Sequence, residues 1–314
     1  MLSRQLPEDI VSFLMKSCAE STWKNYSCYI RQWNAFCNEI NVDPVCPNLS
    51  NVLRFLYNLY EKNVGYSVIN TARSSLSIFV NKIDGYEIGK HPLINRFVKA
   101  VFRSRPPKAR YDSVWDASKV LKVFKEWPEN SDLNLKQLSM KLVSLLALCT
   151  GQRCQTLAMI KLEDVVKNLH VEIRVSSLVK TSAPGRCQPC LVLPKFLTCP
   201  LICPVAVLET FLERTNSLRN HSNLLISINR PHGPVTAQTV SRWLKDTLQV
   251  SGISVTDFSG YSFRHASTSK ASSTGVSVDV IYSRAGWSAE SEMFARHYKR
   301  PIDQRHTYAT AVLS

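Results

Sequence analysis

The sequence predicts a mainly α-helical protein with a small β-sheet, an α+β fold, divided into two domains. Its 314 residues are about twice a typical domain length, and 45% of them are hydrophobic, enough to bury a sizeable core. Apolar residues recur at helical spacing throughout the first third of the chain. The later part combines helical spacing with two short stretches that alternate as strands do.

Four helices are expected in the first domain, because apolar residues there lie three and four positions apart. Ser21 or Thr22 is the expected N-cap of the longest helix. Gly65 is expected to close the second helix as its C′ residue, and Pro92 to open the fourth. The predicted helices span 23–40, 50–62, 67–83 and 92–101.

The second domain is expected to combine helices with a short hairpin. Residues 171–175 alternate as a strand, and residues 190–193 form the second strand after a turn at Pro184-Gly185. Apolar spacing predicts helices over 134–149, from Pro204, around Val240 to Leu248, and from Gly260 to beyond Tyr298.

The charge balance predicts a polyanionic partner. Lys and Arg number 39 against 24 Asp and Glu, a net charge of +15. A membrane is the weaker interpretation, since the longest apolar run, Leu142 to Cys149, is far short of the roughly 20 residues of a span. The first residues lack the apolar segment of a signal peptide, so an intracellular nucleic-acid-binding protein is expected.

The segment from Ile88 to Tyr111 carries seven positive charges and no acidic residue. We interpret it as a linker that follows a DNA backbone, although a solvated helix face is the alternative. Pro106-Pro107 stiffens it, which places the domain boundary here, with domains over 1–105 and 106–314. The predicted DNA-binding residues are Lys90, Arg96, Lys99, Arg103, Arg105, Lys108 and Arg110.

Ten cysteines are expected to be reduced thiols, because nothing in the sequence indicates secretion. Cys187, Cys190, Cys199 and Cys203 have a spacing that could hold zinc. Residues 191–194 between the two pairs look like a strand, so zinc is the less favoured alternative and no metal is predicted.

Four elements of the second domain carry candidate chemistry. Arg153 follows a helix end in Thr150-Gly151-Gln152-Arg153, and Lys180 lies at the hairpin tip. Residues 260–265 begin a helix, and residues 285–288 precede a Tyr298 flanked by basic residues. Each element alone is typical of a surface charge or of amphipathic packing.

Together and in this order, the four elements resemble the tyrosine recombinase (phage integrase-like) family over essentially the whole chain. Segments 267–271, 285–288 and 298–301 look most like recombinases of eukaryotic DIRS-type or Crypton-type mobile elements. The resemblance implies a helical, SAM-like core-binding domain over 1–105 that binds DNA. It also implies a catalytic domain of the integrase type over 106–314.

The resemblance also implies roles for individual residues. Tyr298 would be the nucleophile that forms a 3′-phosphotyrosyl intermediate, and Lys180 the general acid for the leaving oxygen. Arg153 and Arg264 would bind the non-bridging phosphate oxygens, for which two guanidinium groups are well suited. No metal, ATP or other cofactor is expected, because the phosphotyrosyl bond conserves the energy of the bond that is cut.

Four further positions depart from the family pattern or complete it. Tyr261 stands where the family has a histidine, and a phenol is a poor base at neutral pH. Thr156 stands where many members have an acidic residue. Trp287 fits the third-box position but lies 11 residues before Tyr298 rather than about nine. His265 follows Arg264 as a basic residue often does in the family.

The predicted function is therefore a site-specific DNA recombinase or integrase that mobilises a transposable element. Its expected partners are double-stranded DNA and further copies of itself, as a tetramer on two duplexes, and its expected location is the nucleus. A catalytically weakened, domesticated DNA-binding protein is one alternative, favoured by Tyr261 and Thr156. A type IB topoisomerase, which shares the chemistry, is another.

Overall fold

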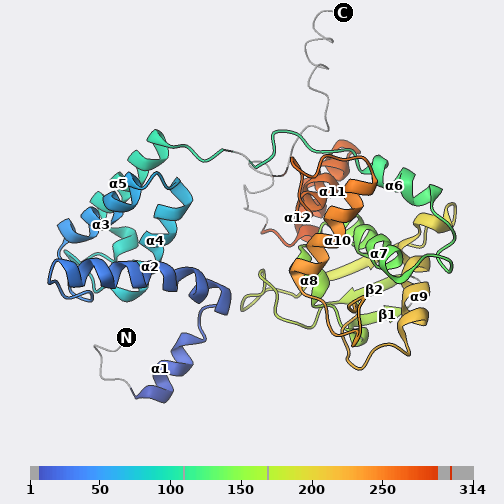
Figure 1. The fold of residues 1–314 in the computed structure, drawn as a ribbon, viewed down its shortest axis with the longest axis horizontal. Helices are drawn as coiled ribbons and strands as arrows, with labels where there is room; N and C mark the ends of the chain where they lie inside the picture. The colour runs from blue at the N-terminus through green and yellow to red at the C-terminus, as the bar shows by residue number, and fades with distance from the viewer. Residues whose placement is uncertain (1–6, 109, 168–169, 289–297, 299–314) are drawn as a thin grey trace, which may run out of the picture. The chain divides into compact units, whose positions relative to one another are not determined.

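A computed structural model describes residues 7–108, 110–167, 170–288 and 298 of the chain. It divides into two compact units, Met1–Lys108 and Ala109–Ser314 (Figure 1). Helices dominate both units, and the second contains a small sheet, so the predicted fold class is confirmed. The assignment of DNA binding to the first unit and catalysis to the second stays a prediction.

The first unit is a helical domain around one aromatic and aliphatic core. Trp33 lies at its centre, edge-on to Phe55 with ring centres 5.2 Å apart, and Leu56, Ile69 and Leu76 are buried beside it. The helices are α1 (Glu8–Met15), α2 (Glu20–Glu39), α3 (Leu49–Glu61), α4 (Tyr66–Phe79) and α5 (Pro92–Ser104), with a short 3-10 turn at Ile88–Lys90.

Three of the expected helix ends in this unit are wrong, one of them being the end of α4, which lies at Phe79 rather than at residue 83. The N-cap of α2 is Ala19, not Ser21 or Thr22, so the helix begins one turn earlier than its apolar stripe. The left-handed residue after α3 is Asn63, with φ of 59°, whereas Gly65 has φ of −80° and caps the start of α4. Asparagine tolerates the left-handed region, so it can end a helix as glycine does.

The second unit is built around α7 (Leu135–Thr150), which contacts α9 (Pro204–Thr215), α10 (Ala237–Val250) and α11 (Ser262–Ser273) (Figure 1). Nearly every position from Leu138 to Ala147 on α7 is buried. The remaining helices are α6 (Ala117–Glu126), α8 (Cys154–Ala158) and α12 (Val278–Ala285), with 3-10 turns at Leu162–Asp164 and Pro200–Ile202.

A three-stranded antiparallel sheet lies against α7 through its third strand. Its order is β1 (Val165–Lys167), β2 (Val171–Arg174) and β3 (Cys190–Leu193), with Val171 opposite Leu193. The sequence did not reveal α6 or β1. The three residues of β1 are too few, and none of them is buried deeply enough, to give an alternating pattern.

The end of the described chain is not the continuous helix that the sequence predicts. α11 ends at Ser273, and α12 begins at Val278 with the Ser277 side chain capping it. The predicted helix leading to Tyr298 lies outside the described residues except for Tyr298 itself. In the part of the chain that is described, no helix combines the length and apolar character of a membrane span.

Candidate active site

Arg264 is held between the carboxyl ends of two helices. Gly151 ends α7 and Gly286 ends α12, each in the left-handed conformation. The Arg264 Nη1 group donates to the Gly151 carbonyl at 2.6 Å, and Nη2 donates to the Ala285 carbonyl at 2.8 Å. Helix C-termini carry partial negative charge, so this position favours a cation even though Arg264 is only 2% exposed.

The Arg264 guanidinium keeps capacity for a ligand. Within the described residues its buried Nε atom has no hydrogen-bond partner. Burial, and then the neighbouring charge of Arg153, lower the pKa of Arg264 to about 10, so it remains a cation at neutral pH. A buried guanidinium with an unpaired donor is suited to bind an anion.

Tyr298 is enclosed by aromatic and cationic side chains, and it is only 3% exposed. Its ring stacks on His265 with centres 4.2 Å apart, and Trp287 lies 4.7 Å away. The Arg264 guanidinium carbon is 5.3 Å from the Tyr298 ring centre, and Ser269 Oγ donates to the Tyr298 carbonyl at 2.7 Å. The 11-residue separation therefore does not keep Trp287 from Tyr298.

Tyr261 contacts the predicted nucleophile directly, because the Tyr261 and Tyr298 hydroxyl groups are hydrogen-bonded to each other. Burial is the main cause that raises the pKa of Tyr261 above that of an ordinary phenol, and the bond to Tyr298 adds to it. The charges of Arg264 and Arg153 act in the opposite direction. Tyr261 is therefore a neutral hydrogen-bond donor at physiological pH and not a base.

Arg153 stands beside this cluster at the start of α8. It is the N-cap residue of that helix and is half-buried. Its charge lowers the pKa of both Arg264 and Tyr261, which shows that it lies within electrostatic reach of both. Thr156, on the same helix, is buried, so this position supplies packing rather than an acidic group.

Lys180 is not part of the buried cluster. It is exposed in the loop between β2 and β3, at a turn closed by Val179 and Ser182. Among the described residues its amine has no hydrogen bond or ion pair. The loop nonetheless passes close to the site, since a methyl group added to Gly286 would lie 3.6 Å from Thr181 Oγ1.

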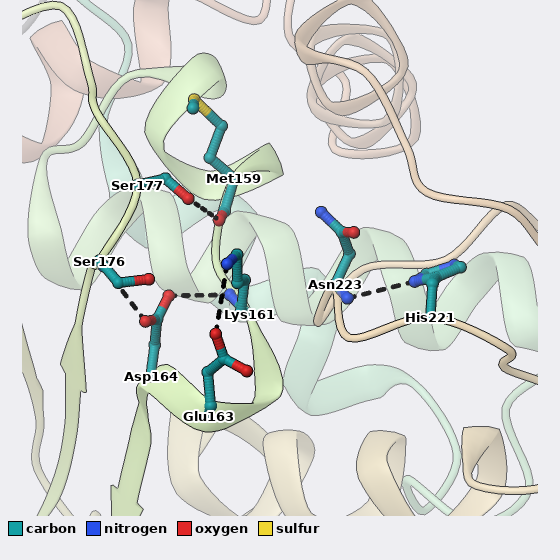
Figure 2. A network of polar contacts seen from close by, with 8 residues as sticks. All are labelled: Met159, Lys161, Glu163, Asp164, Ser176, Ser177, His221 and Asn223. Carbon is teal, nitrogen blue, oxygen red and sulfur yellow. Dashed lines mark hydrogen bonds and ion pairs between the residues drawn. The ribbon is translucent and has the colours of Figure 1, made fainter.

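A polar network fixes the base of this loop (Figure 2). The buried Asp164 carboxylate accepts a hydrogen bond from the Lys161 backbone N–H at 2.9 Å and another from that of Ser176 at 3.1 Å. Ser177 Oγ donates to the Met159 carbonyl nearby at 3.4 Å. The segment after α8 is thereby joined to the start of the loop that carries Lys180.

The predicted DNA-binding residues have different surroundings. Arg96, Lys99 and Arg103 lie on one exposed face of α5, spaced three and four apart. Arg105 Nη1 instead donates to the Tyr60 carbonyl at 2.7 Å, so this guanidinium caps the end of α3. Three further residues are exposed: Lys90, Lys108 and Arg110. Lys90 forms an ion pair with a neighbouring glutamate, and Arg110 belongs to the second unit.

The cysteines are free thiols. Cys187 and Cys190 are exposed, whereas Cys203 is buried and its sulfur accepts a hydrogen bond from the Phe196 N–H at 3.2 Å. No three histidine, cysteine or acidic side chains gather into a metal site in the part of the chain that the structure describes. The zinc alternative has no support here.

Sequence reasoning missed an exposed polar stripe on α10. The buried face of this helix includes Trp243 and Leu248, and the turn before Tyr261 packs on it so closely that a side chain at Gly260 would collide with the Ser241 backbone. Spacings of four, three and four could have revealed the stripe. It comprises Gln238, Arg242, Lys245 and Gln249.

A tyrosine beside one arginine, with a second arginine in electrostatic reach, makes this cluster a candidate phosphoryl-transfer site. The Phage integrase family matches residues 116–305, more than half of the chain. The chain belongs to this family. No curated protein sequence matches it significantly.

Solved structures share its fold at low sequence identity. A lambda integrase (75–356) dimer bound to a COC′ core site is 18% identical over 95% of both chains, with a TM-score of 0.57. XerH recombinase bound to palindromic difH is 14% identical over 85% of this chain and 72% of that one, with a TM-score of 0.55. Tn1549 transposon integrase with circular intermediate DNA is 14% identical over 85% of both chains, with a TM-score of 0.52.

Proposed function

We propose that this protein is a site-specific DNA recombinase that cuts and rejoins strands through a 3′-phosphotyrosyl intermediate on Tyr298. The observation that carries the proposal is the enclosure of Tyr298 by Arg264, His265, Trp287 and Tyr261. A core tyrosine would need none of these polar partners, whereas a nucleophile that attacks a phosphodiester needs both cations and a hydrogen-bond donor.

The reaction follows from the groups present. The Tyr298 oxygen attacks phosphorus and gives its proton to a solvent water molecule, while the bond from phosphorus to the 5′ oxygen breaks and that oxygen takes a proton from Lys180. Arg153 and Arg264 stabilise the charge on the non-bridging oxygens. Tyr261 donates a hydrogen bond to the Tyr298 oxygen as that oxygen becomes negative. One phosphate ester replaces another, so neither ATP nor a cofactor is required.

Two basic surfaces are suited to hold the duplex. The α5 face formed by Arg96, Lys99 and Arg103 can follow phosphates. The α10 stripe carries glutamine, arginine and lysine, the side chains that read adenine and guanine edges in the major groove. Affinity should therefore fall steeply with rising salt, because each phosphate contact releases counterions. An affinity that barely changes with salt would contradict this interface.

The wider setting is also part of the proposal. A lambda integrase tetramer bound to a Holliday junction shares the fold, with a TM-score of 0.52, 17% identity and coverage of 95% of this chain and 77% of that one. We extend tetramer assembly on two duplexes to this chain. The resemblance of segments 267–271, 285–288 and 298–301 to DIRS-type and Crypton-type recombinases supports mobilisation of a transposable element, and with it a nuclear location.

The test is covalent capture. A duplex is first selected from a random library by its affinity for the protein, then nicked near each candidate site so that the leaving strand diffuses away. The wild-type protein should form an adduct that survives denaturation. Tyr298→Phe should bind within a few-fold of wild type and form no adduct. The control is Tyr308, the other tyrosine near the end of the sequence, and Tyr308→Phe should bind DNA and form the adduct as the wild type does. An adduct with Tyr298→Phe would refute the proposal.

The second candidate function is sequence-specific binding without cleavage. The specific observation in its favour is Tyr261, a neutral phenol where the family has a histidine. A protein of this kind would select a duplex from the library but give no adduct on any nicked form of it. Relaxation of supercoiled DNA without pairing of two duplexes would instead indicate a topoisomerase.

A further inference from the structure

The first segment of the second unit lies directly on the turn that carries Tyr261. The Tyr111 hydroxyl is hydrogen-bonded to Ser259 Oγ at 2.8 Å, and its ring meets His265 edge-on with centres 5.0 Å apart. Trp115 Nε1 donates to Ser262 Oγ at 2.8 Å. Tyr111 and Trp115 are both buried, so the end of the predicted linker and the residues that follow it are fixed against the candidate active site.

These anchors bring Arg110 to the site. Its Nη2 group donates to Ser259 Oγ at 3.2 Å, and its guanidinium carbon lies 5.4 Å from the centre of the Tyr261 ring. The Arg110 side chain is exposed, in contrast to Arg264, whose two terminal nitrogens bond to helix carbonyls. Arg110 is therefore an exposed cation over the ring of Tyr261, whose hydroxyl is hydrogen-bonded to that of Tyr298.

We propose that Arg110 is an active-site residue that binds a non-bridging oxygen of the phosphodiester being cleaved. This inference rests on the proposed function. It separates Arg110 from Lys108, two residues earlier, which is exposed and belongs to the first unit. Lys108 adds to affinity for the duplex, whereas Arg110 acts on the reacting phosphate.

The contacts of Arg110 allow it to exchange its protein partner for a phosphate oxygen. A hydrogen bond to a neutral serine hydroxyl is weaker than a charge-assisted bond to phosphate, so an arriving phosphate can displace Ser259. The flat face of the guanidinium can remain over the Tyr261 ring while its edge turns to the oxygen. A lysine at this position would retain the charge but lose the planar fork.

The experiment compares Arg110→Gln with Lys108→Gln in the full-length protein, on the nicked duplex used for covalent capture. Adduct formation is followed in single turnover at saturating DNA, and affinity is measured separately. Arg110→Gln should lower the saturating rate on the order of 10²-fold, as loss of a transition-state donor does, with affinity within a few-fold of wild type. Lys108→Gln should weaken affinity and leave the saturating rate unchanged.

The remaining outcomes are also decisive. Arg110→Lys should recover part of the lost rate, because charge returns without the bidentate geometry. Arg110 is exposed, so the melting temperature of the variants should match that of the wild type. If Arg110→Gln changes only affinity, as Lys108→Gln does, this inference is wrong and the proposed function stands. If the wild type forms no adduct, the proposed function fails and this inference with it.

Discussion

The cluster around Tyr298 and the loop that carries Lys180 hold the groups that we propose for one reaction, yet they are built in opposite ways. Arg264, His265 and Tyr298 are buried and held by hydrogen bonds or ring contacts within the protein. Lys180 is exposed, and in the described part of the chain nothing pairs with its amine. Substitution in the cluster should therefore cost stability as well as rate, whereas substitution in the loop should cost rate alone.

The largest effect is expected at Arg264. Arg264→Ala removes a cation from the reacting phosphate and leaves the Gly151 and Ala285 carbonyls buried without a donor. The rate of adduct formation should fall by about 10³-fold, and each orphaned carbonyl should destabilise the fold by about 1–3 kcal/mol. Single-turnover kinetics and urea unfolding measure the two. A variant with wild-type stability would show that Arg264 does not join α7 to α12.

The Lys180 loop provides the contrasting case. Lys180→Ala should slow adduct formation by about 10²-fold while the free energy of unfolding changes by less than about 0.5 kcal/mol. Replacing the 5′ bridging oxygen by sulfur should restore the rate, because a thiolate leaves without a proton. A variant that stays slow on the sulfur substrate would contradict a general-acid role.

A smaller effect is expected from Tyr261→His, and it should appear in the pH dependence of the rate of adduct formation. The pKa of Tyr261 is raised in the fold, so this phenol remains protonated across pH 5.5–8 and should give no step in the rate there. A histidine introduces a group with a pKa near 6.5 that accepts the Tyr298 proton only when neutral. The variant should therefore gain about tenfold in rate as the pH rises from 5.5 to 7.5.

Other groups that face Tyr261 set the controls for this experiment. His265 and Arg264 on α11, Arg153 on α8 and Arg110 before α6 surround it. Tyr261→Phe keeps all four and removes only the hydroxyl, so it should be slow at every pH. If wild type itself shows a step near pH 6.5 that is lost in His265→Gln, then His265 accepts the Tyr298 proton in the wild-type protein, which would contradict the flat pH profile predicted for it.

The smallest effect on the reaction is expected at Lys141, in the middle of α7 and far from the chemistry, where a substitution should change stability only. This side chain is 0% exposed, and burial lowers its pKa to about 8. Between about pH 8 and pH 10.4, Lys141 is neutral in the folded protein but still protonated in the unfolded chain. The free energy of unfolding should therefore rise with pH across that window. Lys141→Met should remove this rise and raise stability at pH 7 by about 2–3 kcal/mol.

Unfolding midpoints at pH 7 and pH 10 measure this prediction. Lys136→Met is a suitable control, because Lys136 lies on the same helix but its amine is partly exposed and pairs with Asp246. A destabilised Lys141→Met would mean that the amine has a partner that matters to the fold. Activity per folded molecule should be unchanged in both variants.

Local sequence signals predicted helix ends near the candidate site, such as Gly151 at the end of α7. The choice of Arg153, Arg264 and Trp287 came from the family resemblance, because each motif alone is typical of a surface charge or of packing. Contacts between distant segments could not be predicted in the same way. The bond between Tyr261 and Tyr298, the capping of α3 by Arg105 and the position of Arg110 over Tyr261 all depend on tertiary packing.

The fold shows the same difference between features that local sequence predicts and features that depend on contacts between distant segments. Long amphipathic helices such as α2 and α10 were predicted because their apolar stripes are periodic, whereas β1 depends on its neighbour β2 for its existence. Gly65 was assigned to the end of α3 because glycine usually takes the left-handed position. Asn63 takes it instead, two residues earlier, a choice that the sequence left open.

The most direct test of the central claim is to identify the residue that carries the phosphate. The hydroxyl groups of Tyr261 and Tyr298 are hydrogen-bonded to each other, so each of them is a candidate to attack the phosphate. The trapped adduct is digested with protease and nuclease, and the nucleotide-bearing peptide is sequenced by mass spectrometry. The phosphate should be found on Tyr298 alone. A phosphotyrosyl bond on Tyr261, or on Tyr308, would contradict the assignment of the nucleophile.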